Sequence, residues 1–167
     1  VLGGNPMVSN GSLMTAPDVK KRLKAIRARG GRIVVVDPRR TETARMADEH
    51  VSIRPGADGL LLAALVNTVF EEGLERSAPG ADLAEGLAEA RLALAGFSPE
   101  RVAPAIGLEA GAIRGLARAF AAADGAVAYG RMGVSVQAFG GLCQWLVNLL
   151  NLVTGNLDRP GGAMFPN

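Results

Sequence analysis

A carboxylate and two guanidinium groups stand together after a short apolar run. Residues 33–36 are four consecutive β-branched residues, and they are followed by Asp37, Pro38, Arg39 and Arg40. Such a run predicts a strand that is buried on both faces, as in a parallel sheet. Because Pro38 cannot donate to a sheet ladder, the strand ends there, and Asp37 is placed at its carboxyl edge. This edge offers groups that suit a ribose and phosphates, although the same residues also fit a solvated turn.

Glycine-rich turns follow two other predicted strand ends. Residues 3–12 have the sequence GGNPMVSNGS, and residues 130–133 have the sequence GRMG after an apolar stretch at 126–129. A strand, a glycine-rich turn and a helix in this order form the layout in which α/β proteins bind phosphates. The spacing matches neither GxGxxG nor GxxxxGK[ST], so each turn alone also fits a plain connecting loop.

Three other polar or reactive residues are more typical of structural roles. Asp58 precedes an apolar stretch at 59–72 and is predicted to cap that helix. His50 is the only histidine and is predicted to flank a strand, and Cys143 is the only cysteine and is predicted to lie in a helix core. One cysteine excludes an intramolecular disulfide and a thiolate cluster within this sequence. We therefore expect no metal site formed by these residues.

The hydrophobic pattern alternates between helices and strands and so predicts an α/β fold. Strands are expected at 33–36, 50–54 and 126–129. Helices are expected from near Thr15 or Asp18 to 29, at 41–48, 59–72, 82–95, from 98 onward, and at 108–123 and 137–154. The expected architecture is an open, mostly parallel sheet with helices on both faces, in three layers α/β/α. The carboxyl ends of the strands would then meet at one edge, where a nucleotide binds in such sheets.

Composition sets limits on function and partners. The chain of 167 residues is 49% hydrophobic and 20% charged, which fits one globular domain over residues 1–167. A net charge of +2 and an aromatic content of 4% do not support a nucleic-acid surface. No targeting or membrane-insertion signal is visible, so cytoplasm and periplasm both remain open. The chain starts without Met at what resembles a strand end, and we expect it to be excised from a longer polypeptide.

The order of several motifs is similar to that of a known family. The segments GGNP, VVDPRRTETARMADEHVSIRPGAD, YGRMG and LVTGNLDRPGGAMF resemble the third, cofactor-binding domain of the molybdopterin-guanine-dinucleotide oxidoreductases of the dimethyl-sulfoxide-reductase type. This family includes formate dehydrogenases and nitrate reductases, and the resemblance runs over essentially all 167 residues. It implies a Rossmann-like domain that holds one of two pterin dinucleotides around molybdenum or tungsten, in a parent enzyme like a formate dehydrogenase or nitrate reductase.

The resemblance also implies a set of cofactor-binding residues at the strand ends: Gly4, Asn5, Pro6, Asp37, Pro38, Arg39, Asp58, Gly130, Met132 and Gly133. The first three would face the pyrophosphate and guanosine, and the next three would line the ribose and guanine. Asp58 would accept hydrogen bonds from guanine N1 and N2, because a carboxylate offers two acceptors side by side. The last three would lie along the cofactor from the other half of the sheet.

The sequence departs from a complete enzyme of this family. Parent enzymes carry a cysteine cluster for a 4Fe-4S centre and a residue that ligates the metal, and the single Cys143 cannot supply the cluster. We therefore expect no catalytic and no metal-binding residue in this segment, which would be inactive alone. The implied partners are the other domains of the parent and electron-transfer subunits, without nucleic acid and without membrane insertion.

Two alternatives from other classes stay open. One is a nucleotide-binding α/β module of another type, NAD- or FAD-like, as in the middle domain of thiamine-diphosphate enzymes or in sirtuin-like proteins. Against a standard NAD site, Asp37 lies 33 positions after Gly4, whereas dinucleotide dehydrogenases place the acidic residue ~20 positions on. The other alternative is a non-catalytic domain whose polar loops contact a protein partner.

Overall fold

Four chain segments lie side by side and parallel in the centre of the fold. The structure, a computed structural model, describes residues 1–11, 16–79 and 81–164. Strand β1 (Val34–Val36) pairs with β2 (Glu49–Val51), while Leu2 forms parallel bridges to Val36 on one side and to Gly130 on the other. The spatial order is therefore β2, β1, residue 2 and residue 130. Counted along the chain, this is the order 3-2-1-4 of a Rossmann-like sheet.

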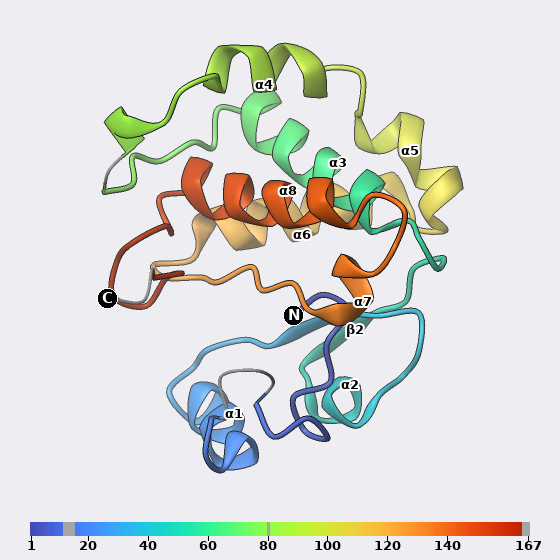
Figure 1. Cartoon of the computed structure of the whole chain (residues 1–167), viewed down its shortest axis with the longest axis vertical. Coiled ribbons are helices and arrows are strands. Elements are labelled where there is room, and N and C mark those ends of the chain that lie inside the picture. The colour runs from blue at the N-terminus through green and yellow to red at the C-terminus, as the bar shows by residue number, and fades with distance from the viewer. Residues whose placement is uncertain (12–15, 80, 165–167) are drawn as a thin grey trace.

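Helices cover both faces of this sheet, as Figure 1 shows, with α1 and α2 below it and α3, α6 and α8 above it. Ile33 and Val35 pack with Ala44 of α2 and with α1, whereas Val36 points into the larger core on the other face. The predicted three-layer α/β/α arrangement is thus confirmed. The helices are α1 (Val19–Ala28), α2 (Glu42–Met46), α3 (Asp58–Glu71), η2 (Ala81–Leu83, a 3-10 turn), α4 (Leu87–Leu94), α5 (Pro99–Ile106), α6 (Ala110–Ala122), α7 (Met132–Ser135) and α8 (Gly140–Val153).

The central helix of the larger core is α3. It packs against α4, α5, α6 and α8, and its residues 61–70 are all buried. The sequence predicts this, because an apolar surface all round a helix requires neighbours all round. None of the helices within the described ranges is long and apolar enough to cross a bilayer.

Two helices begin where the sequence predicts, each with a side-chain cap, and one predicted helix is shorter than expected. Thr41 caps α2 by accepting from Ala44 N at 3.1 Å, and Ser98 caps α5 with Pro99 in its first turn. The helix predicted at 82–95 is instead the short η2 turn followed by α4. Gly86 separates the two with φ +79°, a left-handed conformation that a continuous helix does not contain. Of the two expected starts of α1, Thr15 lies outside the described residues, and Asp18 caps the helix as expected.

The strand predicted at 126–129 does not form a ladder, and that prediction is wrong in detail. Instead, the side-chain amide of Asn151 in α8 forms hydrogen bonds with backbone groups of this segment, as a neighbouring strand would. Its Oδ1 accepts from Ala128 N at 2.9 Å, and its Nδ2 donates to Ala128 O at 2.9 Å. Only the end of the segment joins the sheet, through the bridge from Gly130 to Leu2. A single buried amide thus replaces a row of backbone pairs.

An ion cluster links α3, α5 and α6 and gives a testable pH dependence. Arg114 donates to both carboxylate oxygens of Glu100 at 2.8 Å, and also to Glu71 and Glu72. The hydrogen bonds from Arg114 lower the pKa of Glu100 from its ordinary 4.5 to about 2. A carboxyl whose pKa is lower in the folded state stabilises the fold above pH 4.5 and loses this contribution as the pH falls toward 2.

We expect the urea midpoint of unfolding to drop between pH 5 and pH 2.5, and this drop to be smaller in the Arg114→Met variant. Arg101→Met is the matched control, because the Arg101 guanidinium donates to the carbonyl of Gly96 and to no carboxylate among the described residues. An equally steep pH dependence in Arg114→Met would contradict the role of the cluster.

Candidate functional site

The two glycine-rich turns meet where the order of the sheet reverses direction. Arg131 N donates to Leu2 O, and Gly133 N donates to Gly3 O, both at 3.0 Å. A Cβ on Gly133 would lie only 2.9 Å from Gly3 Cα, and Gly3 itself has φ +56°. Only glycine fits this close approach of two backbones. In open α/β sheets the ligand binds at this switch point, outside the carboxyl ends of the strands.

Three backbone amides at this junction have no acceptor in the described part of the chain. Among the described residues, none accepts a hydrogen bond from the N–H groups of Gly4, Asn5 or Met132. Gly4 is buried, while the side chain of Met132 at the start of α7 is exposed. Backbone amides on adjoining turns that have no internal partner are suited to bind an anion.

The side chain of Asn5 ties the first turn to the start of α2. Its Nδ2 donates to Glu42 Oε2 at 2.7 Å, while its Oδ1 accepts from Thr43 N at 3.2 Å and from Thr43 Oγ1 at 2.8 Å. The hydrogen bond from Asn5 is also the main reason that the pKa of Glu42 is lowered. Pro6 is buried beside this contact. The Asn5 side chain therefore positions the turn, and little of it is left for a ligand.

Asp37, Pro38 and Arg39 form a tight turn at the carboxyl end of β1. Asp37 Oδ1 accepts from Arg39 N at 2.8 Å, and the guanidinium of Arg39 lies 3.5 Å from Glu42 Oε2. Pro38, Arg39 and Arg40 are exposed. His50 Nε2 donates to the carbonyl of Asp37 at 2.8 Å, which agrees with the structural role predicted for it. The two predicted segments, at Asn5 and at Arg39, thus meet around Glu42.

Asp58 does not cap α3, so that prediction is wrong. The helix begins one residue earlier than expected, Ala57 takes the N-cap position, and no side chain caps it. The Asp58 side chain is instead buried, with 5% of the residue exposed, and Oδ2 accepts from Gln137 Nε2 at 3.0 Å. Gln137 Nε2 also lies 3.4 Å from the carbonyl oxygen of Gly133. Gln137 thereby links Asp58 to the junction of the two turns.

Gln137 is a residue that the sequence analysis missed. Its contact with Asp58 spans 79 positions, and the only available signal was its place four residues after Gly133, in the segment between two helices. Gly130 lies against a different side chain, because a Cβ at this position would be 3.0 Å from Gln144 Nε2. The structure therefore brings the predicted residues to one edge in two groups, one around Glu42 and one around Gln137.

Cys143 lies in the core of the fold, as predicted. It is fully buried, and its Sγ would be 3.4 Å from a Cβ placed on Gly59. Burial, and then the negative charge of Asp58, raise the pKa of this thiol. No group of three or more His, Cys, Asp or Glu side chains in the described part of the chain could hold a metal ion.

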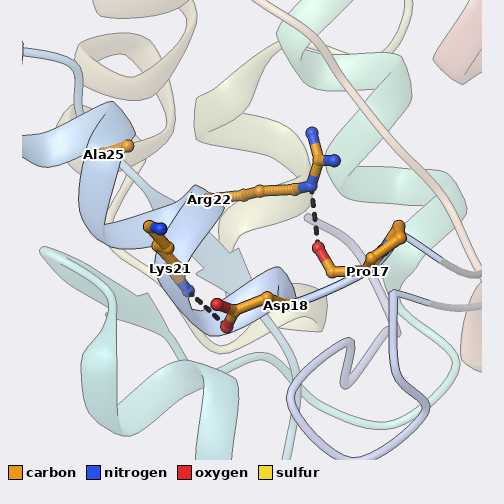
Figure 2. A pocket seen from close by; sticks show the side chains of 5 residues that line it. All are labelled: Pro17, Asp18, Lys21, Arg22 and Ala25. Atoms are coloured by element: carbon orange, nitrogen blue, oxygen red, sulfur yellow. Dashed lines mark hydrogen bonds between the residues drawn. The ribbon is translucent and has the colours of Figure 1, made fainter.

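A surface hollow elsewhere does not belong to this site. Figure 2 shows it at the start of α1, lined by Pro17, Asp18, Lys21, Arg22 and Ala25. Arg22 Nε donates to the carbonyl of Pro17 at 2.9 Å, so this guanidinium already has a partner. None of its lining residues is among those predicted to bind a cofactor.

Comparison with known proteins gives clear relatives, although no family model matches the chain. Formate dehydrogenase H of Escherichia coli strain K12 is 34% identical over 166 residues, which are 99% of this chain and 22% of that protein. Periplasmic nitrate reductase of Desulfovibrio desulfuricans is 34% identical over 146 residues, 81% of this chain and 19% of that protein. Among solved structures, acetylene hydratase from Pelobacter acetylenicus superposes with a TM-score of 0.76 at 27% identity, over 87% of this chain and 20% of that one.

The chain thus spans about one fifth of the length of the relatives that it matches. The two curated relatives are oxidoreductases by name, and the matches agree with the resemblance carried by the motifs at the strand ends. The chain therefore belongs to the family of dimethyl-sulfoxide-reductase type molybdopterin oxidoreductases, among formate dehydrogenase-like and nitrate reductase-like sequences.

Proposed function

We propose that this chain is a cofactor-binding domain that holds the guanosine and pyrophosphate part of one molybdopterin guanine dinucleotide. The domain would belong to a longer oxidoreductase, like a formate dehydrogenase or a nitrate reductase. The cofactor would supply molybdenum or tungsten redox chemistry, and a 4Fe-4S cluster would be bound outside these residues. The relatives named above favour this function over an NAD-like module or a pure interaction domain.

The observation that carries the proposal is the buried carboxylate of Asp58 beside the junction of the two turns. Asp58 Oδ2 has Gln137 as a partner, and no donor to Oδ1 is found among the described residues. A carboxylate accepts about four hydrogen bonds, so it can still take two from the N1 and N2 donors of guanine. The donor set therefore fits a guanine base at this position.

The phosphates would lie across the junction itself. The unclaimed amides of Gly4, Asn5 and Met132 would donate to the pyrophosphate, with Gly130 and Gly133 allowing the backbone to come close. Asn5 would act through its amide, because its side chain is already bonded to α2. Asp37, Pro38 and Arg39 would line the ribose and the adjoining edge of the base. Pro6 would support the turn from its buried position.

Calorimetric titration of the chain with GDP and with ADP tests the proposal. We expect GDP to bind at least tenfold more tightly than ADP, because only guanine presents two adjacent donors to Asp58. Replacing Asp58 by Asn should weaken the binding of GDP by ~2 kcal/mol, because two hydrogen bonds to a charged acceptor are lost. The affinity for ADP should not change.

Asp124→Asn is the matched control, because Asp124 is an exposed carboxylate in the turn after α6. It should change neither affinity. Equal affinities of the unmodified chain for GDP and ADP, or equal losses for both in Asp58→Asn, would argue against guanine recognition.

A further inference from the structure

A row of exposed apolar side chains runs along the outer side of α8 and onto α7. Phe139, Leu142 and Trp145 follow at intervals of three residues and are 66%, 51% and 48% exposed. Met132 and Val136, at 59% and 70%, continue the row onto and just beyond α7. These five side chains are called the α8 stripe below. Residues three apart lie on the same side of a helix, so Phe139, Leu142 and Trp145 share one surface, and α7, which carries Met132, packs against α8.

The α8 stripe differs from the scattered apolar residues of an ordinary surface. Within the described ranges, nine large apolar side chains are exposed, and five of them fall between residues 132 and 145. A contiguous apolar patch marks an interaction site, whereas single exposed apolar residues need no explanation. This concentration therefore indicates a surface that another molecule or domain covers.

The lack of charged residues along α7 and α8 is an independent argument that another molecule or domain covers this surface. Residues 132–157 contain no Asp, Glu, Lys or Arg, although the solvent side of a surface helix normally carries them. The comparison inside the molecule is α3, where residues 59–70 are also uncharged. That helix is enclosed by α4, α5, α6 and α8, while the main contacts of α8 are with α3 and α7. The sequence of α8 thus suits a helix that is enclosed on both sides.

We propose that the α8 stripe is the docking surface for another domain of a longer polypeptide. The relatives have about four fifths of their length outside the matched segment, so they contain such domains. The stripe also begins at Met132, next to Gly133 at the junction of the turns. A domain seated on the stripe would therefore border the cofactor edge as well. This inference rests on one part of the proposed function, namely that the chain belongs to a longer oxidoreductase.

The chemistry of the stripe favours an apolar protein surface over other occupants. An amphipathic helix that binds a membrane surface carries Lys and Arg on its polar side, and α8 has none. A second copy of the chain would protect the stripe in a way that depends on protein concentration. Membrane and self-association are therefore treated as alternative outcomes of the test.

Thiol labelling can show whether another domain covers the α8 stripe. Phe139→Cys places a reactive thiol on the stripe, and Leu92→Cys places one on α4 at a site that is 78% exposed and outside the stripe. The natural Cys143 is fully buried and should not react in the folded chain. Labelling by a maleimide is followed by peptide mass spectrometry, both in the 167-residue chain and in the full-length polypeptide that contains it. Thermal unfolding verifies that both variants fold.

We expect Phe139→Cys to react at least tenfold more slowly in the full-length polypeptide, and Leu92→Cys to react at similar rates in both. Equal rates for Phe139→Cys would overturn the proposal, and so would a native product of only 17.2 kDa. Protection that rises with concentration in the 167-residue chain, together with a dimer mass, would overturn it in favour of a second copy. Protection that needs phosphatidylglycerol vesicles would overturn it in favour of a membrane. The GDP titration is a separate measurement, so nucleotide binding and docking can fail independently.

Discussion

Replacing Asn151 by leucine is expected to lower the free energy of unfolding by ~3 kcal/mol, because two buried backbone groups lose their partner. Asn151 is 1% exposed, and its amide satisfies both Ala128 N and Ala128 O. Leucine has a similar volume, so the loss would come from the unmade hydrogen bonds rather than from a cavity. Urea unfolding followed by circular dichroism gives the measurement.

Asn148→Leu is the matched control for this variant, because Asn148 lies one turn earlier on α8 and is exposed. Its effect should stay within ±0.5 kcal/mol, the range for surface substitutions. If the two variants lost the same stability, the role assigned to the Asn151 amide would be wrong. Since Ala128 leads directly to Gly130, the Asn151 variant should also weaken GDP binding.

Replacing Gly133 by alanine is expected to lower the free energy of unfolding by ~2 kcal/mol, because the new methyl group would be packed too closely against backbone atoms. The new Cβ would lie 2.9 Å from both Gly3 Cα and Gly3 O, and neither atom can rotate away. The two turns must separate, which also displaces the amides of Gly4 and Met132. We therefore expect weaker binding of GDP in addition to a lower melting temperature.

The control for this variant is Gly115→Ala in the middle of α6. A Cβ at Gly115 would meet no atom within 4 Å, so alanine should stabilise the helix by ~0.5–1 kcal/mol. Opposite signs for the two substitutions would support the close approach at the junction. A neutral Gly133→Ala would show that the two turns are not held together as described.

The sequence pattern predicted those helices and strands that depend on interactions between residues close in the chain. Four β-branched residues gave β1 and its burial on both faces, and an apolar surface all round gave the enclosed helix α3. Thr41 and Ser98 marked the starts of α2 and α5, because their side chains cap amides three residues ahead. In each case the deciding interaction lies within a few residues of the pattern.

The parts that sequence reasoning missed depend on partners far along the chain. Asn5 bonds Thr43 across 38 positions, Asn151 bonds Ala128 across 23, and Gln137 bonds Asp58 across 79. A polar residue in an apolar helix, such as Asn151, has the same local signature whether it faces solvent or replaces a strand. For the candidate site, the residue types at the strand ends were therefore predictable, whereas their division into two groups was not.

Because Leu2 pairs with both Val36 and Gly130, the sheet can be completed only late during translation. Of the four sheet segments, that of Leu2 is synthesised before the others; Val36 follows 34 residues later, but Gly130 only 128 residues later. The central segment of the sheet thus keeps one edge unpaired for most of synthesis, a state that invites pairing with other nascent chains. Its contact with the last sheet segment closes a long loop, so final folding should be slow and chaperones should have time to bind.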